Sequence, residues 1–401
     1  MKNRFEIIDR IIEYGIYVYI FLMFLSKGEG IRNIIIFGNL GLWLLTFRYR
    51  KKLYILKGIL PRLCWIYLAT FVFSVIFSLD PLFSLKELKG DPLKFASLFP
   101  VVATVMADKA RLEKAVYTIF FTITFIVFIG YYSYIYHDIP MLKPDTVLLH
   151  AWHNRFAGYI NTLLPFAFIL YLLLHKPALK AGLIILYILS VLALVLSTSR
   201  GGYAAFVGIV FVWCLYLSRT KGYSFKRIAA LLVIIFLLLG SFSYVMFPDV
   251  RTRIANTSTE LVTFNERTEL WGAAFYAILN RPVFGWGYGE RFYRQDEPFL
   301  NTPYKKAPPK GEHNLFLTVL FHQGIVGFIP FLLLILTTIR VFWKEALKSK
   351  GIKSYVLIAC VSVFVGNYVI HAQLESMFRL QHIAVVLGLG MAAGGIGENK
   401  G

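Results

Sequence analysis

The sequence is poor in charged residues and in cysteine. Only 16% of its 401 residues are charged, and its three cysteines, Cys64, Cys214 and Cys360, lie far apart within apolar runs. Cysteines spaced in this way do not resemble a disulfide framework or a metal site, in which ligands come in close pairs. We therefore expect all three to be small core residues.

Motifs of phosphate and metal chemistry are also missing. The sequence has no GxxxxGK[ST] phosphate loop, no HExxH, no CxxC pair and no GxSxG nucleophile elbow. It has no Asp-x-Asp pair either, so a diphosphate bound through a metal ion is not indicated. We expect neither a metal nor a cofactor, and any positive charge opposite a phosphate has to come from arginine.

Apolar residues are abundant instead. The chain is 58% hydrophobic with a mean hydropathy of +0.64, which is more apolar surface than a soluble domain of this size can bury. Lipid offers no partner to backbone polar groups, so each spanning segment must be a helix, and the apolar runs are too long for the strands of a barrel. These features predict an all-α polytopic membrane protein, organised as one integral membrane domain over residues 1–401.

Hydropathy predicts about twelve transmembrane helices. The fourth is short, begins at Pro92 and could be re-entrant rather than spanning. The predicted spans are 11–26, 31–47, 59–79, 92–107, 113–136, 155–174, 179–197, 202–219, 226–247, 313–341, 353–372 and 376–395.

The net charge is +20, which in a soluble protein would suggest a nucleic acid partner. With the N-terminus inside the cell, most of the lysines and arginines fall in cytoplasmic segments, as the positive-inside rule requires. The membrane thus accounts for much of the charge, and we expect membrane lipids rather than nucleic acid as partners. The same orientation places one long loop, residues 248–312, on the outer face.

That loop is polar where nearly all the rest of the chain is apolar. It is rich in arginine, lysine, glutamate and proline, and contains one helical-looking piece at 266–279, in which Leu270, Ala274 and Ala277 could share a face. The glycines of 285–289 predict a turn that needs close backbone approach. The loop ends at His313-Asn314, which open the next apolar segment.

Two arginines of the outer face could bind an anion. Arg200 lies in 197–202, where Gly201 and its neighbour would let the backbone approach a ligand and the guanidinium presents a planar fork that suits phosphate oxygens. Arg267, near the start of the helical piece, could be a second anion clamp. The alternatives are a snorkelling arginine in a helix–helix turn for Arg200, and a solvated ion pair with Glu266 or Glu269 for Arg267.

His313 could act as a general base, because a histidine at the rim of an apolar helix can take a proton near neutral pH. The alternative is a helix-capping or interface histidine. Asn314 could orient the imidazole, and Arg155 could be a further basic contact or only an interfacial anchor. We expect structural roles for three further histidines, His150, His322 and His382. We expect the same of the polar residues on the last external turn, which are His371, Gln373, Glu375 and Arg379.

Taken together and in order, these motifs resemble the O-antigen ligase/polymerase superfamily, and most of all O-antigen ligase. The resemblance covers most of the chain and is strongest over about 197–330. The motifs that carry it are Ser199-Arg200-Gly201-Gly202, Arg267 followed by Trp271, the stretch 282–289, and His313-Asn314 followed by Gly324 and Gly327, which we read as close-packing positions of a membrane helix.

The resemblance implies a metal-independent, inverting glycosyltransferase of the GT-C type, multi-pass in the bacterial inner membrane. The implied donor is a glycan on undecaprenyl diphosphate, and the implied acceptor of a ligase is a sugar hydroxyl of lipid A-core at the periplasmic face. Arg200 and Arg267 would bind the diphosphate, with Arg155, Asn314 and Gly201 as further substrate contacts. His313 would take the proton from the acceptor hydroxyl.

An O-antigen polymerase or a protein O-oligosaccharyltransferase of the same superfamily would share this chemistry. A transporter of lipid-linked sugars belongs to a different class, and would be expected to carry charges near the membrane midplane and often an internal repeat. Here the notable charges lie at the predicted outer rim and no repeat is visible. The sequence therefore favours an enzyme over a transporter.

Overall fold

The structure is a computed structural model that describes residues 2–50, 52–137, 143–255, 261–290, 292, 297–299, 313–374 and 379–395. Regular secondary structure within these ranges is helical, apart from an isolated bridge between Asp145 and His150. The all-α prediction is confirmed. The three cysteines are buried and unpaired with one another, as core residues should be.

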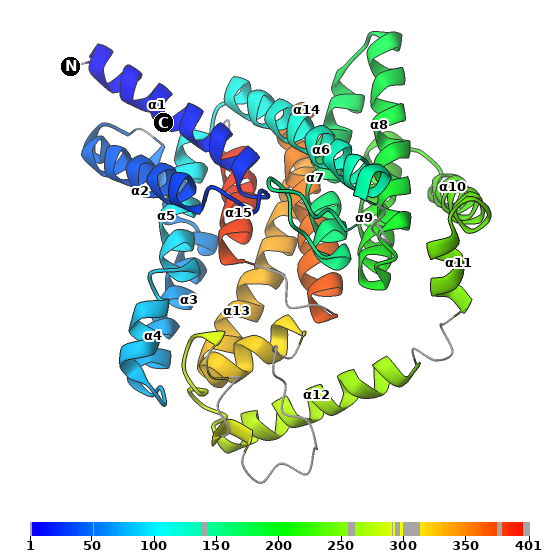
Figure 1. The fold of residues 1–401 in the computed structure, drawn as a ribbon. Coiled ribbons are helices and arrows are strands. Elements are labelled where there is room, and N and C mark those ends of the chain that lie inside the picture. Colours follow the sequence, from blue (N-terminus) through cyan, green and yellow to red (C-terminus); the bar gives the residue numbers. More distant parts are fainter. Residues whose placement is uncertain are drawn as a thin grey trace.

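Every one of the twelve predicted apolar segments falls on a helix (Figure 1). Apolar runs predict these positions well, because a long run of side chains that avoid water must be helical to satisfy its own backbone. The corresponding helices are α1 (Lys2–Leu22), α2 (Glu29–Leu45), α3 (Ile59–Ile76), α5 (Asp91–Val105), α6 (Lys109–His137), α7 (His153–Leu173), α8 (Pro177–Leu196), α9 (Arg200–Lys221), α10 (Phe225–Met246), α13 (Leu315–Lys348), α14 (Gly351–Val363) and α15 (Leu380–Gly395).

Seven helices of the described chain are long and apolar enough to cross a membrane. They are α3, α6, α7, α8, α9, α13, and α14 together with the π-helix η5 (Phe364–Ile370) and the 3-10 turn η6 (His371–Gln373) that continue it. The chain is therefore a multi-pass membrane protein. The full number of twelve spans stays a prediction.

The fourth predicted span is a short buried helix. Its 15 residues, α5, rise only about 22 Å, less than the thickness of a hydrocarbon core. It packs along α15, where a Cβ placed on Gly388 would lie 2.8 Å from Cβ of Val102. Phe95 and Phe99 of α5 are completely buried. Protein rather than lipid therefore surrounds most of this helix.

The predicted outer loop contains two helices, α11 (Pro248–Ala255) and α12 (Leu261–Asn280). The helical piece expected at 266–279 is thus confirmed, and it begins earlier than predicted. Ala274 and Ala277 are fully buried, as members of one face should be. Figure 1 shows α12 crossing below the bundle, from α11 toward the first part of α13. Two helices were not predicted. One is α11, and the other is α4 (Pro81–Glu87), which Asp80 caps and Pro81 begins.

A buried ion network fastens α1 to the start of α6. Asp9 accepts from Arg50 at 2.8 Å and from Arg111 at 2.6 Å. Glu13 accepts from Arg111 at 3.0 Å and from Lys114 at 3.2 Å. Each carboxylate therefore has two cationic partners, which offsets the cost of removing these charges from water.

Replacing Asp9 with alanine should destabilise the protein by about 3 kcal/mol, because the buried guanidinium of Arg50 would lose its carboxylate partner and Arg111 would keep only Glu13. Thermal unfolding in detergent micelles measures this loss. Lys109→Ala, which removes an exposed lysine from the same end of α6, is the matched control and should leave the midpoint nearly unchanged. Equal midpoints for the two variants would contradict a structural role for the network.

Candidate functional site

Arg200 stands at the first position of α9, directly after a tight turn from α8. Ser199 caps the helix, because its hydroxyl oxygen accepts from the backbone N–H of Gly202 at 3.1 Å. Ser197 and Ser199 are fully buried, whereas Arg200 is exposed. The turn therefore presents a guanidinium next to the positive end of a helix, an arrangement that favours an anion.

His313 and Asn314 form the corresponding start of α13. Asn314 caps that helix, because its side-chain oxygen accepts from the backbone N–H groups of Phe316 and Leu317 at 3.0 and 3.1 Å. His313 is half-buried and has a φ of 50°. A capping residue beside the histidine is consistent with the sequence interpretation, and the imidazole lies at the rim of the helix.

Left-handed backbone marks both turns. Among the residues that the structure describes, Thr198 (φ 52°) and His313 (φ 50°) are the non-glycine residues with positive φ. Such conformations cost of order 1–3 kcal/mol and tend to occur where function requires them. Thr198 lies directly before the motif that contains Arg200, and His313 is itself part of the second motif.

The turns before α9 and α13 meet around η6. A Cβ built on Gly201 would lie 2.7 Å from Cδ2 of His371, so the imidazole packs directly against this glycine. Asn314 donates through its side-chain amide to the backbone oxygen of Gln373 at 3.2 Å. The structure therefore brings the Arg200 and His313 segments together at one end of the bundle. Gly201 packs closely against a side chain of the protein itself, the imidazole of His371. Its predicted contact with the substrate stays a prediction.

Arg155 lies at the same end, on the first turn of α7. Two residues later, Ala157 packs against Gly202, and Asn161 donates to the backbone oxygen of Gly202 at 2.9 Å. Arg155 thus lies near the start of the helix that packs against the α9 turn. The spacing of Glu375 and Arg379, four residues apart, predicts an ion pair, but Glu375 lies outside the described ranges.

Arg267 is carried by α12, which packs on the beginning of α13. Ala273 and Ala277 share an apolar cluster with Phe321, and Leu317 and Leu320 pack against it. These contacts show that α12 lies beside α13, and they do not locate the guanidinium group of Arg267. The approach of Arg267 to Arg200 and His313 stays a prediction.

The helix α13 is broken at Gly324, which has φ 60° and ψ −162°. The carbonyl groups of Phe321 and His322, freed by the break, accept from the N–H groups of Trp286 and Gly287 at 2.8 and 3.2 Å. On the other side of the break, Ile325 donates to Pro282 and Val326 to Val283, at 2.8 and 3.2 Å. The stretch 282–289 thus replaces the missing helical hydrogen bonds one for one.

Glycine is required on both sides of this junction. Gly285 has a φ of 72°, and a Cβ there would lie 2.6 Å from the backbone of 321–323. A Cβ on Gly324 would meet the backbone of Val283 and Phe284. The close backbone approach predicted for 285–289 is confirmed. Gly324 is a close-packing position, but it packs against the backbone of Val283 and Phe284 at a break in the helix, which was not predicted. Gly327 also packs closely, against the side chain of Gln323.

Gly324→Ala should lower the free energy of unfolding by at least about 2 kcal/mol, because it forces a Cβ into a glycine-only conformation. Gly182→Ala in α8 is the matched control, since nothing lies within 4 Å of a Cβ at that position. Urea or thermal unfolding of the micelle-bound proteins compares the two. If both variants unfold alike, the break in α13 does not depend on Gly324.

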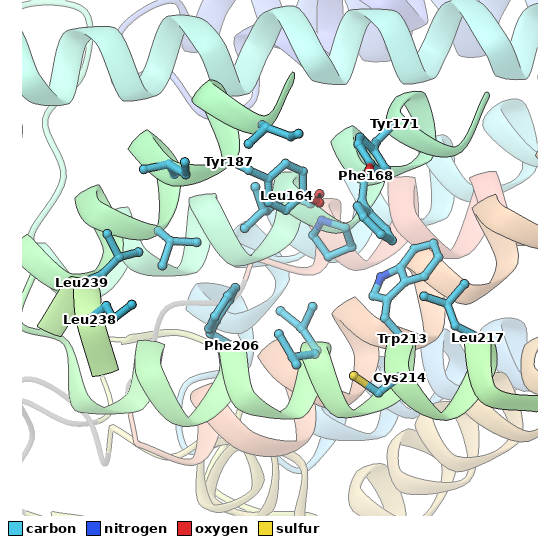
Figure 2. Close-up of a pocket in the computed structure, with 16 residues that line it drawn as sticks. Leu164, Phe168, Tyr171, Tyr187, Phe206, Trp213, Cys214, Leu217, Leu238 and Leu239 are labelled. Carbon is cyan, nitrogen blue, oxygen red and sulfur yellow. Dashed lines mark hydrogen bonds between the residues drawn. The ribbon is translucent and has the colours of Figure 1, made fainter. Parts of the chain in front are cut away.

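An apolar cavity of about 600 Å³ lies between α7, α8, α9 and α10 (Figure 2). Phe206, Trp213 and Leu217 of α9 face it, along with Tyr187 of α8 and Leu238 of α10. The cavity begins six residues below Arg200, about 9 Å along the helix axis. A long hydrocarbon chain could therefore run down α9 from a charged group held at Arg200.

The comparison with known families now bears on these features. Residues 185–332 match the family model described as O-Antigen ligase. The match includes Arg200, Arg267 and His313-Asn314, whereas Arg155 and His371 lie outside it. It supports the O-antigen ligase/polymerase superfamily that the motifs indicate, and hence an O-antigen ligase/polymerase-type enzyme. A search of the curated proteins found no match.

Within the described residues, no group of three or more histidine, cysteine, aspartate or glutamate side chains could bind a metal ion. The arrangement of helix starts, arginines and an imidazole suits an anionic leaving group and a proton transfer.

Proposed function

We propose that this protein is an inverting, metal-independent glycosyltransferase of the O-antigen ligase type. It moves a glycan from undecaprenyl diphosphate to a sugar hydroxyl of lipid A-core at the periplasmic face of the bacterial inner membrane, which completes lipopolysaccharide. The observation that carries the proposal is the meeting of the Arg200 and His313 turns around η6, within or beside the segment that matches the family.

The proposed chemistry follows from charge. In the transition state negative charge builds on the departing diphosphate, so guanidinium groups fixed beside it lower the barrier. Arg200 and Arg267 take this role, and the positive end of α9 adds to it. His313 accepts the proton of the attacking hydroxyl, on the opposite face of the sugar ring from the diphosphate. Asn314 orients the loop that carries the imidazole, and Arg155 and Gly201 contribute further substrate contacts.

The lipid part of the donor needs an apolar site. The cavity along α9 supports the proposal, because it starts below Arg200 and is lined almost entirely by apolar side chains. Diphosphate bound at the start of α9 would leave the polyprenyl chain facing this cavity. Membrane lipids surround the rest of the bundle.

Other members of the superfamily remain as second candidates. A polymerase would extend the lipid-linked glycan, and a protein O-oligosaccharyltransferase would transfer it to serine or threonine. The family match supports this group of enzymes as a whole, and the choice of the ligase rests on the resemblance of the motifs to O-antigen ligase. A transporter of lipid-linked sugars fits less well, because Arg200, His313 and Arg155 all lie at helix starts rather than at mid-helix.

The deciding experiment supplies the purified protein with lipid-linked glycan and each acceptor in turn. We expect capped lipid A-core, with the glycan transferred as a block, and no dependence on added metal or loss with EDTA. Longer lipid-linked glycans would identify a polymerase, and glycosylated serine or threonine would identify the protein-modifying relative. Failure with all three acceptors would overturn the proposal of sugar transfer, and inhibition by EDTA would overturn the metal-independent mechanism.

A further inference from the structure

The η6 segment, His371–Gln373, touches both turns of the candidate site although neither the motifs nor the family match include it. It follows α14 and η5, and lies 170 residues after Gly201 in the chain. His371 is 1% exposed and so is held entirely among protein groups. A buried imidazole at this position needs a reason.

The contact of His371 with the α9 turn is tight. A Cβ on Gly201 would lie 2.7 Å from Cδ2 and 3.3 Å from Nε2 of the imidazole, and 3.4 Å from Cβ of Leu374. Only a glycine leaves room for the ring this close to the helix backbone. The imidazole therefore supports the backbone of the residue directly after Arg200.

The contact with the α13 turn is a hydrogen bond. Asn314 uses both ends of its side-chain amide, because the oxygen caps α13 and the nitrogen donates to the backbone oxygen of Gln373. His313 is the neighbour of Asn314 and has left-handed backbone. The position of the proposed base thus depends on the same segment that supports the Arg200 turn.

The π-helix η5 holds the η6 segment in register. Asn367 donates to the backbone oxygen of Gly158 and to the hydroxyl of Thr162 on α7, at 3.2 and 2.7 Å. A π-helical turn shifts the facing of every later residue relative to an α-helix, and such turns are frequent at functional sites. Here the shift brings His371 onto Gly201.

We propose that His371 is a positioning residue, which sets the separation between the Arg200 guanidinium and the His313 imidazole by bridging the two turns through the η6 segment. This inference rests on the proposed function, because it assigns those two groups to one reaction. His371 itself does not take the proton. Its removal displaces the two reacting groups relative to each other, and a misplacement of about 1 Å can cost on the order of 100-fold in rate.

The first test separates positioning from substrate affinity. His371→Ala should lower kcat by about 10- to 100-fold while KM for the lipid-linked donor stays within about threefold, because anion binding at Arg200 survives but alignment does not. His371→Gln, which keeps a polar side chain of similar reach, should recover part of the rate. A rise in KM at constant kcat, or a rate loss fully explained by loss of folded protein, would overturn the proposal.

The second test uses the two glycines of α9 that face the same partner segment. Gly201→Ala pushes a Cβ into the imidazole, whereas Gly208→Ala, seven residues deeper on the helix, meets the end of the Ile370 side chain. We expect a rate loss from Gly201→Ala and little from Gly208→Ala. His371→Ala should reduce the further effect of Gly201→Ala, because the ring it collides with is gone. Strict additivity of these two substitutions, or equal losses from both glycine variants, would refute the contact.

The third test addresses the bond from Asn314. Asn314→Ser keeps an oxygen that can cap α13 but has no amide to reach Gln373, whereas Asn314→Ala loses both functions. The serine variant should unfold at nearly the wild-type temperature and still lose about tenfold in kcat. Serine with full activity would show that the link to Gln373 does not matter.

A readout without substrate separates this inference from the proposed function. Hydrogen exchange of the intact protein in micelles should rise at both 197–203 and 313–318 in His371→Ala, and at neither in Gly208→Ala. Coupled exchange in a protein that transfers no glycan would overturn the proposed function and keep the bridge. Unchanged exchange in a protein that transfers glycan normally would overturn the bridge alone.

Discussion

Substitution of His313 by alanine should reduce glycan transfer by about 10²- to 10⁴-fold, while the protein still inserts into the membrane and binds its lipid-linked donor. The attacking hydroxyl is a poor nucleophile unless a base removes its proton, and His313 stands at the rim of α13 within the cluster of helix starts. The measurement is transfer of labelled glycan from purified donor to lipid A-core, with donor binding followed separately.

The backbone at His313 calls for a second variant. Its φ of 50° is strained for alanine but accessible to asparagine, so His313→Asn removes the base with less backbone penalty. Both variants should be inactive. His150→Ala is the matched control, since this exposed histidine pairs with Asp145 at 2.6 Å and the proposed reaction does not use it. Full activity of His313→Asn would remove the proposed base.

Arg200→Ala should lower kcat for transfer by about 10²- to 10³-fold, the usual loss when one donor to a developing negative charge is removed. Lysine should restore little, because it lacks the planar fork that holds two phosphate oxygens at once. Arg219→Lys is the matched control. It lies in the last turn of the same helix, where its guanidinium rests on the ring of Trp343, and should leave transfer nearly unchanged.

Arg267 provides an internal check on the second prediction. If both guanidinium groups hold one diphosphate, Arg267→Ala should act in the same direction, and the double variant should lose less than the product of the two single losses. Full rescue of Arg200→Ala by lysine, or independent effects of the two arginines, would contradict a shared diphosphate.

Much of the bundle could be predicted from the sequence, because hydropathy decides which segments leave water and backbone satisfaction then decides that they are helical. Each of the twelve apolar segments is a helix, and α12 was expected from the spacing of Leu270, Ala274 and Ala277. The turn at 285–289 was also expected, since glycines so closely spaced require unusual backbone. These are local signals, each carried by neighbouring residues.

The break in α13 could not be predicted in the same way. Apolar residues continue on both sides of the break, and what bends the helix is a set of backbone hydrogen bonds from 282–287, some forty residues earlier in the chain. The bridge through His371 is even harder to predict from the sequence. It joins residues that are far apart in the chain and that come together only in the folded protein. The local sequence therefore indicates only a structural role for His371, and it contains the two motifs without a signal for the segment that connects them.

The pairing of α5 with α15 has a consequence for biosynthesis. Neither helix presents much of its surface to lipid, and α5 is too short to remain across a bilayer without help. At ordinary translation speeds, α15 leaves the ribosome on the order of tens of seconds after α5. During that interval α5 has to wait at the membrane beside α2 and α3, and the bundle can close only when the chain is almost complete.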